Sequence, residues 1–190
     1  AFGAGNHLSD VYDLLSCMGH VTVEGNFIGA RWSKLLINSA FSGLSTLTGE
    51  TFGKVSQDHA MRRVAQRIIK ECIDVAKAAD IRMEPVQGHR IDRLFDYRGP
   101  VKKAISYALI PIAMKKHRSL ISSMLQDLRA GKKCEIDFIN GVVCAYGKKR
   151  VISTPFNDRV VQIVHAIEEG EYPIAADNIR RFDDILSKRS

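Results

Sequence analysis

The chain has 190 residues, of which 45% are hydrophobic and 26% are charged, a composition typical of a globular protein with one sizeable core. No apolar stretch approaches the roughly 18 residues of a membrane-spanning helix, and no secretion signal is visible, so we expect a cytoplasmic protein without a membrane partner. The formal charge of +7 allows an anionic partner. Because aromatic residues do not interleave the basic clusters, we expect no nucleic-acid partner.

The four cysteines, Cys17, Cys72, Cys134 and Cys144, are scattered along the chain and form no C-x-x-C pair. The six histidines are equally dispersed. We therefore expect reduced thiols and no metal site.

The first residues predict one helix and one strand. Residues 7–19 suit a short helix, and residues 20–24 alternate like a brief strand before Gly25. One helix and one strand are too few for a domain. We therefore expect residues 1–24 to be the tail of an upstream domain and residues 25–190 to form a second domain, in a chain that is a piece of a longer protein.

From Phe27 onward the apolar residues follow the three- and four-residue spacing of helices. Asp58 and Pro100 are suited to begin two of them, and the spacing of Ser123 and Gln126 predicts a capping box. The expected helical ranges are 27–48, 58–81, 100–116 with a bend near Pro111, 122–131, 134–143, 154–168 and 175–188, with a turn over 50–56. The expected fold class is therefore all-α.

The segment 32–45 places a lysine in an otherwise apolar helix. At about 100° per residue, Asn38, Ser42 and Ser45 fall within roughly 80° of Lys34, whereas most apolar residues fall on the other side. One interpretation is an amphipathic helix whose polar side meets water. The other is a functional site, since a lysine among apolar residues costs free energy unless its charge is lost or paired.

An amine in such a place can act as a Schiff-base nucleophile, as a general acid or base, or as an anchor for an anion. A carboxylate elsewhere in the fold would hold the proton on it, and Glu135 is a candidate. The sequence pattern alone does not bring Lys34 and Glu135 together.

Four motifs resemble the C-terminal helical domain of ketopantoate reductase, also called 2-dehydropantoate 2-reductase. Their order and spacing agree with that family over about residues 20 to 170. The motifs are Trp32-x-Lys-Leu-x-x-Asn38, Ser122-Ser-Met-Leu-Gln-Asp-Leu-Arg-x-Gly131, Glu135-Ile-Asp-x-Ile-Asn-Gly141 and Thr154-Pro-x-Asn157. The resemblance implies a multi-helix domain like that of ketopantoate reductase and 6-phosphogluconate dehydrogenase, preceded by a short helix and strand left from a Rossmann domain.

The resemblance also implies roles for individual residues. Lys34 corresponds to the general acid that protonates the ketone oxygen as hydride arrives from NADPH, and Glu135 to its acidic partner. Asn38 matches a substrate-binding amide and Ser123 a hydroxyl that contacts the substrate carboxylate. Each residue also has a purely structural interpretation. Ser123 could be a helix cap and nothing more, Glu135 could be an acidic residue of a first helical turn and nothing more, and Asn38 could form a hydrogen bond to a neighbouring loop.

Two positions depart from the family pattern. Eight residues after the lysine, Ser42 stands where the family commonly has a second asparagine, and Phe52 stands where it often has another. We expect Ser42 still to contact substrate. Lost amides put selectivity for ketopantoate itself in doubt, since hydrogen-bonding sites discriminate through their polar partners. Asn140-Gly141 is interpreted as structural, with the glycine allowing a close helix approach.

No G-x-G-x-x-G motif lies between a strand and a helix, so the main cofactor site is expected in an absent Rossmann domain. The predicted function is that of the helical half of an NADPH-dependent reductase that converts ketopantoate to pantoate in pantothenate biosynthesis, inactive alone and without a metal. Expected partners are a small 2-keto acid, the missing Rossmann domain and a possible second copy in a homodimer.

Two other functions stay open at this stage. The same scaffold could reduce a different 2-keto acid or serve a 3-hydroxy acid. Alternatively, the chain could be a non-catalytic helical dimerisation module, in which replacing Lys34 would leave the oligomer unchanged.

Overall fold

Helices surround a central long helix in this computed structural model, which describes residues 8–21, 23–86 and 88–187. Within these residues the chain forms helices and no strand, so the all-α prediction is confirmed. The helices are α1 (Leu8–Ser16), α2 (Phe27–Ile37), α3 (Gly43–Thr48), α4 (Phe52–Gln57), α5 (His59–Ala78), α6 (Ile91–Phe95), α7 (Pro100–Ala113), α8 (Ser123–Arg129), α9 (Ile136–Arg150), α10 (Pro155–Glu168) and α11 (Asp183–Ser187). Three further segments are helical but not α-helical: the π-helical η1 (Asn38–Ser42) and the 3₁₀-helical η2 (Lys115–His117) and η3 (Ala176–Phe182).

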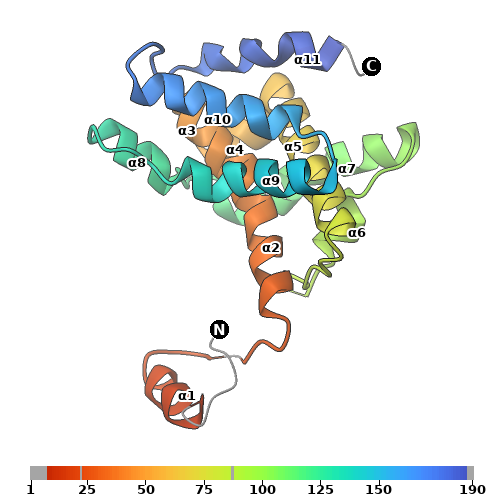
Figure 1. Cartoon of the computed structure of the whole chain (residues 1–190), viewed down its shortest axis with the longest axis vertical. Coiled ribbons are helices and arrows are strands. Elements are labelled where there is room, and N and C mark those ends of the chain that lie inside the picture. Colours follow the sequence, from red (N-terminus) through yellow and green to blue (C-terminus); the bar gives the residue numbers. More distant parts are fainter. Residues whose placement is uncertain (1–7, 22, 87, 188–190) are drawn as a thin grey trace.

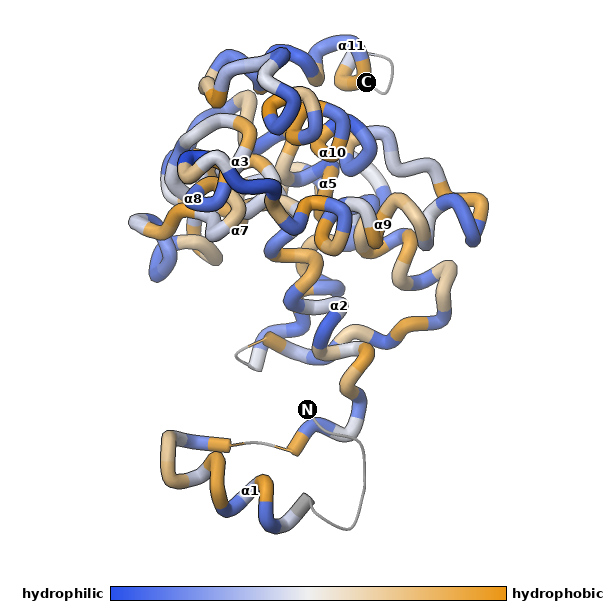
Figure 2. Tube along the Cα trace, turned by 60° about the vertical axis from the view of Figure 1, so that its left-hand side comes forward, coloured by the Kyte–Doolittle hydropathy of each residue, from blue (hydrophilic) through white to orange (hydrophobic). Residues whose placement is uncertain are grey.

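The central helix is α5, which packs against α2, α4, α7, α9 and α10. Asp58 caps it, because its Oδ1 accepts from the backbone N–H groups of Ala60 and Met61 at 3.0 and 3.1 Å, as predicted. Figure 1 shows α9 and α10 side by side across the bundle, with α11 at one end and α2 leaving at the other toward α1. Hydrophobic and hydrophilic residues alternate in short runs along the helices of the bundle (Figure 2). The hydrophobic residues of these helices therefore lie on one face, and this face packs into the common core.

A buried polar network joins three helices inside this core. The Glu71 carboxylate of α5 accepts from the backbone N–H groups of Phe156 and Asn157, both at 3.0 Å, and from Asn157 Nδ2 at 2.8 Å. It thereby satisfies the open amides at the start of α10. Asn140 Nδ2 of α9 donates to Asn157 Oδ1 and to the backbone carbonyl of Ser39, both at 3.0 Å. The structural interpretation of Asn140 is therefore confirmed.

The predicted helix over 27–48 is continuous but changes its winding. Between α2 and α3, η1 is a π-helical turn, an arrangement that is rare and usually short. The next residue, Gly43, lies where a Cβ would come within 2.9 Å of Asn140 Oδ1 and 3.0 Å of Val160 Cγ1. The close helix approach thus needs glycine at Gly43. The prediction that Gly141 allows this close approach was wrong, because a Cβ at Gly141 would meet nothing closer than 3.5 Å.

Several local predictions were wrong. Of the strand expected at 20–24, the described residues 20, 21, 23 and 24 are irregular, while residues 1–7 and Thr22 lie outside the described part. The expected turn over 50–56 contains α4, which Thr51 caps by accepting from the Lys54 N–H at 3.2 Å. The last predicted helix is divided into η3 and α11. Helices as short as these have the same capping residues as turns, so the sequence alone does not distinguish the two.

The cap of α8 also differs from the prediction. Ser122, and not Ser123, caps the helix, since Ser122 Oγ accepts from the Met124 N–H at 3.1 Å. Ser123 is the first helical residue and its side chain is exposed. Two consecutive serines carry the same capping signal, so the sequence pattern leaves a one-residue ambiguity.

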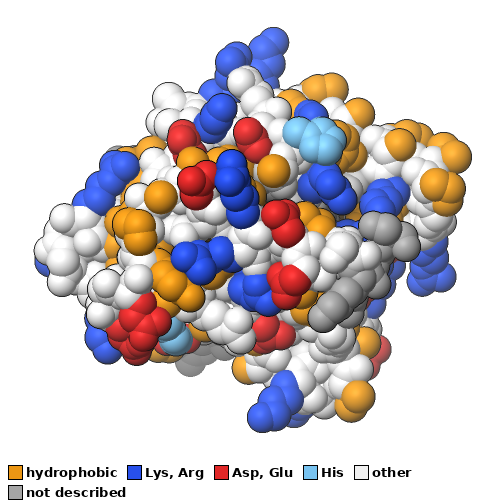
Figure 3. Space-filling view, turned by 90° about the horizontal axis from the view of Figure 1, so that it is seen from above, with side chains coloured by type: hydrophobic (Ala, Val, Ile, Leu, Met, Phe, Trp, Pro, Cys, Tyr) orange, Lys and Arg blue, Asp and Glu red, His pale blue; other side chains and the backbone are white. Residues whose placement is uncertain are grey.

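The surface carries charges of both signs. On the face seen from above in Figure 3, Lys and Arg side chains are interspersed with Asp and Glu. Among the described residues, no helix is both long and apolar enough to cross a membrane.

We predict that Glu71→Gln lowers the free energy of unfolding by about 2 kcal/mol, the usual size for hydrogen bonds to a charged group. The amide would present a donor to amide N–H groups that need an acceptor. Urea unfolding followed by circular dichroism measures the change. Glu169→Gln, at an exposed position after α10, is the matched control. Equal stability of the two variants would contradict the structural role of Glu71.

Candidate functional site: a cleft between α2 and α9

An open cleft of about 900 Å³ lies between α2 and α9. Its polar lining includes Lys34, Asn38 and Glu135, three residues singled out in the sequence. The remaining lining residues are Glu24, Phe27, Ile28, Ala30, Arg31, Trp32, Leu35, Phe138, Ile139, Val142 and Tyr146. Two motifs that are about 100 residues apart in the chain therefore meet at one site.

The wall formed by α2 is fixed at its first turn. Asn26 caps the helix by accepting from the Gly29 N–H at 3.1 Å, and its Nδ2 donates to the Arg82 carbonyl at 2.8 Å. Ser33 Oγ donates to the backbone carbonyl of Glu84 at 2.6 Å. These contacts hold one face of α2 against residues 82–84, and a different face carries Lys34 into the cleft.

The wall formed by α9 begins at Glu135, which occupies the position just before the helix. Phe138, Val142 and Tyr146 follow at four-residue spacing and line the cleft on the same side of α9. The Tyr146 ring meets the Trp32 ring edge-to-face, with centroids 5.3 Å apart and planes at 75°. This aromatic pair joins the two walls.

The environment of Lys34 agrees with one of the two interpretations of the sequence, an amphipathic helix whose polar side meets water, and not with a lysine buried among apolar residues. Its side chain is exposed, although the neighbouring Trp32, Ser33 and Leu36 are buried. The polar face of α2 turns toward the open cleft, which gives the ammonium access to water. Within the described part of the chain, Lys34 and Glu135 line the same cleft without forming a salt bridge. Asn38 is half-buried where α2 passes into η1.

The two predicted serines lie beyond the cleft. Ser42 is half-buried in η1, and neither it nor Ser123 lines the cleft. Lys34, Asn38, Ser42 and Ser45 form the polar stripe of the segment 32–45. This stripe continues toward α8, because Ser45 Oγ accepts from the Ser122 N–H at 3.2 Å and donates to the Glu50 carbonyl at 2.7 Å. The structure therefore groups Lys34, Asn38 and Glu135 directly, and places Ser42 and Ser123 toward the other end of the stripe.

Sequence reasoning missed the apolar part of the site. Four large side chains of the cleft are unusually exposed: Phe27 (39%), Ile28 (54%), Phe138 (77%) and Tyr146 (40%). A cluster of this kind marks a surface that binds something. The four-residue spacing along α9 could have revealed its half of the wall, whereas Phe27 and Ile28 carry no signal beyond helix periodicity.

The described residues contain no group of His, Cys, Asp and Glu that could hold a metal ion. All four cysteines are free. Burial raises the pKa of the Cys72 thiol to about 12, so this sulfur is protonated and poorly reactive at neutral pH.

Comparison with known proteins places the fold and the motifs in one family. The model of the C-terminal domain of ketopantoate reductases of the PanE/ApbA type matches residues 26–168. The chain belongs to this family. A 2-dehydropantoate 2-reductase from Pyrococcus horikoshii is 27% identical over 167 residues, which are 87% of this chain and 49% of the relative.

Solved structures agree with this assignment. A PanE/ApbA family ketopantoate reductase from Ralstonia eutropha superposes with a TM-score of 0.69 at 25% identity, over 87% of this chain and 50% of that one. D-mandelate dehydrogenase, solved with NADH and anilino(oxo)acetate, has the same fold, with a TM-score of 0.67 at 19% identity over 88% and 50% of the two chains. The chain thus spans about half the length of the relatives that it matches.

We predict that Gly29→Ala destabilises the chain by about 1 to 3 kcal/mol, the usual cost of overpacking, because a Cβ would overlap the Arg82 carbonyl and the Asn26 cap. Gly141→Ala is the matched control in α9, where a Cβ would make only ordinary van der Waals contacts and alanine favours the helix by up to about 1 kcal/mol. Thermal unfolding of both variants measures the contrast. A Gly29→Ala variant as stable as the control would refute the tight docking of α2.

Proposed function

We propose that the chain is the substrate-binding half of an NADPH-dependent 2-keto acid reductase, with ketopantoate as substrate and pantoate as product. The observation that supports this proposal most strongly is the meeting of Lys34, Asn38 and Glu135 in one cleft. A lysine, an amide and a carboxylate are the groups that reduction of a carbonyl needs on the substrate side.

In the proposed reaction, NADPH held by the other domain would supply a hydride to the carbonyl carbon of the substrate. Negative charge then develops on the carbonyl oxygen, and the Lys34 ammonium stabilises it and donates a proton to it. Glu135, across the cleft, is its acidic partner, and after the transfer a proton from solvent water, relayed through the Glu135 carboxylate, restores the Lys34 ammonium. Asn38, one helical turn from Lys34, orients the substrate by donating a hydrogen bond.

Ser42 and Ser123 are proposed to bind the far end of the substrate. They lie toward the end of the polar stripe at which Ser45 contacts the start of α8. A substrate whose carbonyl meets Lys34 would direct its carboxylate along this stripe toward the hydroxyl of Ser123. The cap made by Ser122 leaves Ser123 unused for helix capping, which frees its hydroxyl for a ligand.

The nucleotide is proposed to bind mainly to another domain. The described residues contain no strand, and therefore no strand-turn-helix unit that could hold its phosphates. The exposed Ile28 and Phe138 offer the apolar surface that a second domain would cover. We propose that residues 1–24 belong to that Rossmann domain and residues 25–190 to the helical domain. A homodimer stays a prediction.

An alternative substrate on the same scaffold is supported by one observation. Phe52, at a position where the family often has an asparagine, is buried and packs against Phe41 with ring centroids 6.0 Å apart. A packed phenylalanine cannot supply the amide, so a more apolar 2-keto acid, or a 3-hydroxy acid in the reverse direction, is the second candidate.

We predict that the 190-residue chain alone does not oxidise NADPH with ketopantoate, whereas the chain joined to an upstream nucleotide-binding domain does. The physical reason is that catalysis requires the hydride donor to be held beside Lys34. Absorbance of NADPH at saturating substrate measures turnover for a panel that includes ketopantoate and a phenyl-substituted 2-keto acid. Preference for the phenyl substrate would favour the alternative, and robust turnover by the chain alone would overturn the need for a second domain.

A further inference from the structure

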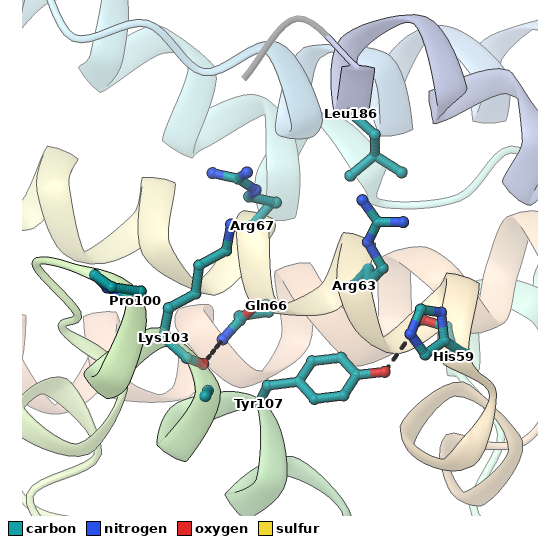
Figure 4. Close-up of a pocket in the computed structure, with 9 residues that line it drawn as sticks. His59, Arg63, Gln66, Arg67, Pro100, Lys103, Tyr107 and Leu186 are labelled. Atoms are coloured by element: carbon teal, nitrogen blue, oxygen red, sulfur yellow. Dashed lines mark hydrogen bonds between the residues drawn. The ribbon is translucent and has the colours of Figure 1, made fainter. Parts of the chain in front are cut away.

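A second pocket, of about 460 Å³, lies between α5 and α7 and reaches α11 at Leu186. Figure 4 shows its side chains, with the arginines rising from α5 and Lys103 from α7. The pocket is lined by His59, Arg63, Gln66, Arg67, Pro100, Lys103, Ala104, Tyr107 and Leu186. None of these residues lines the cleft that holds Lys34.

Positive charges gather in this pocket, and none of the described residues that line it is a carboxylate. Arg63 and Arg67 lie four residues apart on one face of α5, and Lys103 approaches them from α7. Within the described part of the chain, Arg63 and Lys103 form no ion pair. By contrast, Lys70 and Lys77 farther along α5 pair with Asp74 and Asp96.

The charges in the pocket repel one another. Burial lowers the pKa of Lys103, and the positive charges of Arg67 and Arg63 lower it further. Like charges at this spacing on a helix also cost a few tenths of a kcal/mol. A bound anion would remove this repulsion and accept charge-assisted hydrogen bonds from the guanidinium groups.

The pocket is already held in shape by contacts between its two helices. Gln66 Nε2 donates to the Lys103 carbonyl at 2.7 Å and also to Ser106 Oγ. On the other side, the Arg62 guanidinium lies 4.0 Å from the centroid of the Tyr107 ring. A preformed pocket does not need to be ordered when it binds a ligand, which favours affinity.

We propose that this pocket binds a small organic phosphate. Arg63, Arg67 and Lys103 hold the phosphate group. The organic part of the ligand lies against the apolar side of the pocket, formed by Pro100, Ala104 and Leu186. The pocket volume is within the range of small-molecule sites.

A polynucleotide fits the observations less well. Nucleic-acid binding without sequence preference needs aromatic faces on which bases can stack. Among the described residues that line the pocket, Tyr107 is the only Phe, Tyr or Trp side chain; the Arg62 guanidinium covers its face, and the His59 ring packs edge-to-face with it, with ring centroids 5.8 Å apart. The positively charged side chains lie close together in a concave pocket, and this arrangement suits a single phosphate group.

The test is calorimetric titration of the 190-residue chain with AMP, adenosine and inorganic phosphate. We expect saturable AMP binding with a dissociation constant of about 0.1 to 1 mM, weaker phosphate binding and no adenosine binding. Arg63→Ala combined with Lys103→Ala should weaken AMP binding at least about tenfold. Circular dichroism verifies that the variant is folded.

The matched control is Lys148→Ala combined with Lys149→Ala, which removes the same charge from exposed positions at the end of α9. It should change AMP binding less than about twofold. Equal weakening by both variants, equal binding of adenosine, or no saturable binding of AMP or phosphate would overturn the proposal. So would binding of a short single-stranded DNA that depends on Arg63 and Lys103 when AMP does not bind.

Discussion

The buried hydrogen bonds of Glu71, Asn157 and Asn140 are the constraint on which the remaining structure depends. Through them α5 holds the start of α10, α10 holds α9, and α9 holds the backbone of Ser39 beside Asn38. The network therefore sets the distance between α9, which follows directly after Glu135, and the helix that carries Lys34. A buried carboxylate with several hydrogen-bond donors has one arrangement of low free energy, because every other arrangement leaves buried polar groups without partners. The core network therefore fixes the geometry of the cleft.

The cleft itself combines a polar stripe with an apolar wall. Lys34 and Asn38 provide donors where charge would develop, while Phe138 and Ile28 remain largely exposed. Apolar surface of this kind excludes water when a second surface covers it, which strengthens the electrostatic effect of the lysine. An exposed ammonium in the uncovered cleft is thus compatible with the proposed chemistry, because the covering domain would complete its environment.

Much of the fold was predictable because its signals are local. Asp58 at the start of α5 and the i, i+3, i+4 pattern that follows it depend only on nearby residues. The grouping of Lys34, Asn38 and Glu135 was anticipated from the family motifs, and helix periodicity alone would not have supplied it. The exposure of Lys34 was one of two interpretations that the helix pattern left open, whereas the cap at Ser122 and the π-helical turn could not be predicted, because the pattern of nearby residues does not determine them. Gly29 illustrates the same limit, since only the position of Arg82 reveals why a side chain is excluded there.

The central claim is that Lys34 and Glu135 act as one unit on a substrate in the cleft. A double-mutant cycle of Lys34→Ala and Glu135→Gln tests it most directly, in a protein that joins this chain to an upstream nucleotide-binding domain, with kcat for the preferred 2-keto acid as the readout. The account predicts that Lys34→Ala lowers kcat by about 100-fold or more and that adding Glu135→Gln lowers it little further. Unchanged turnover in Lys34→Ala, or losses that multiply fully in the double variant, would contradict it.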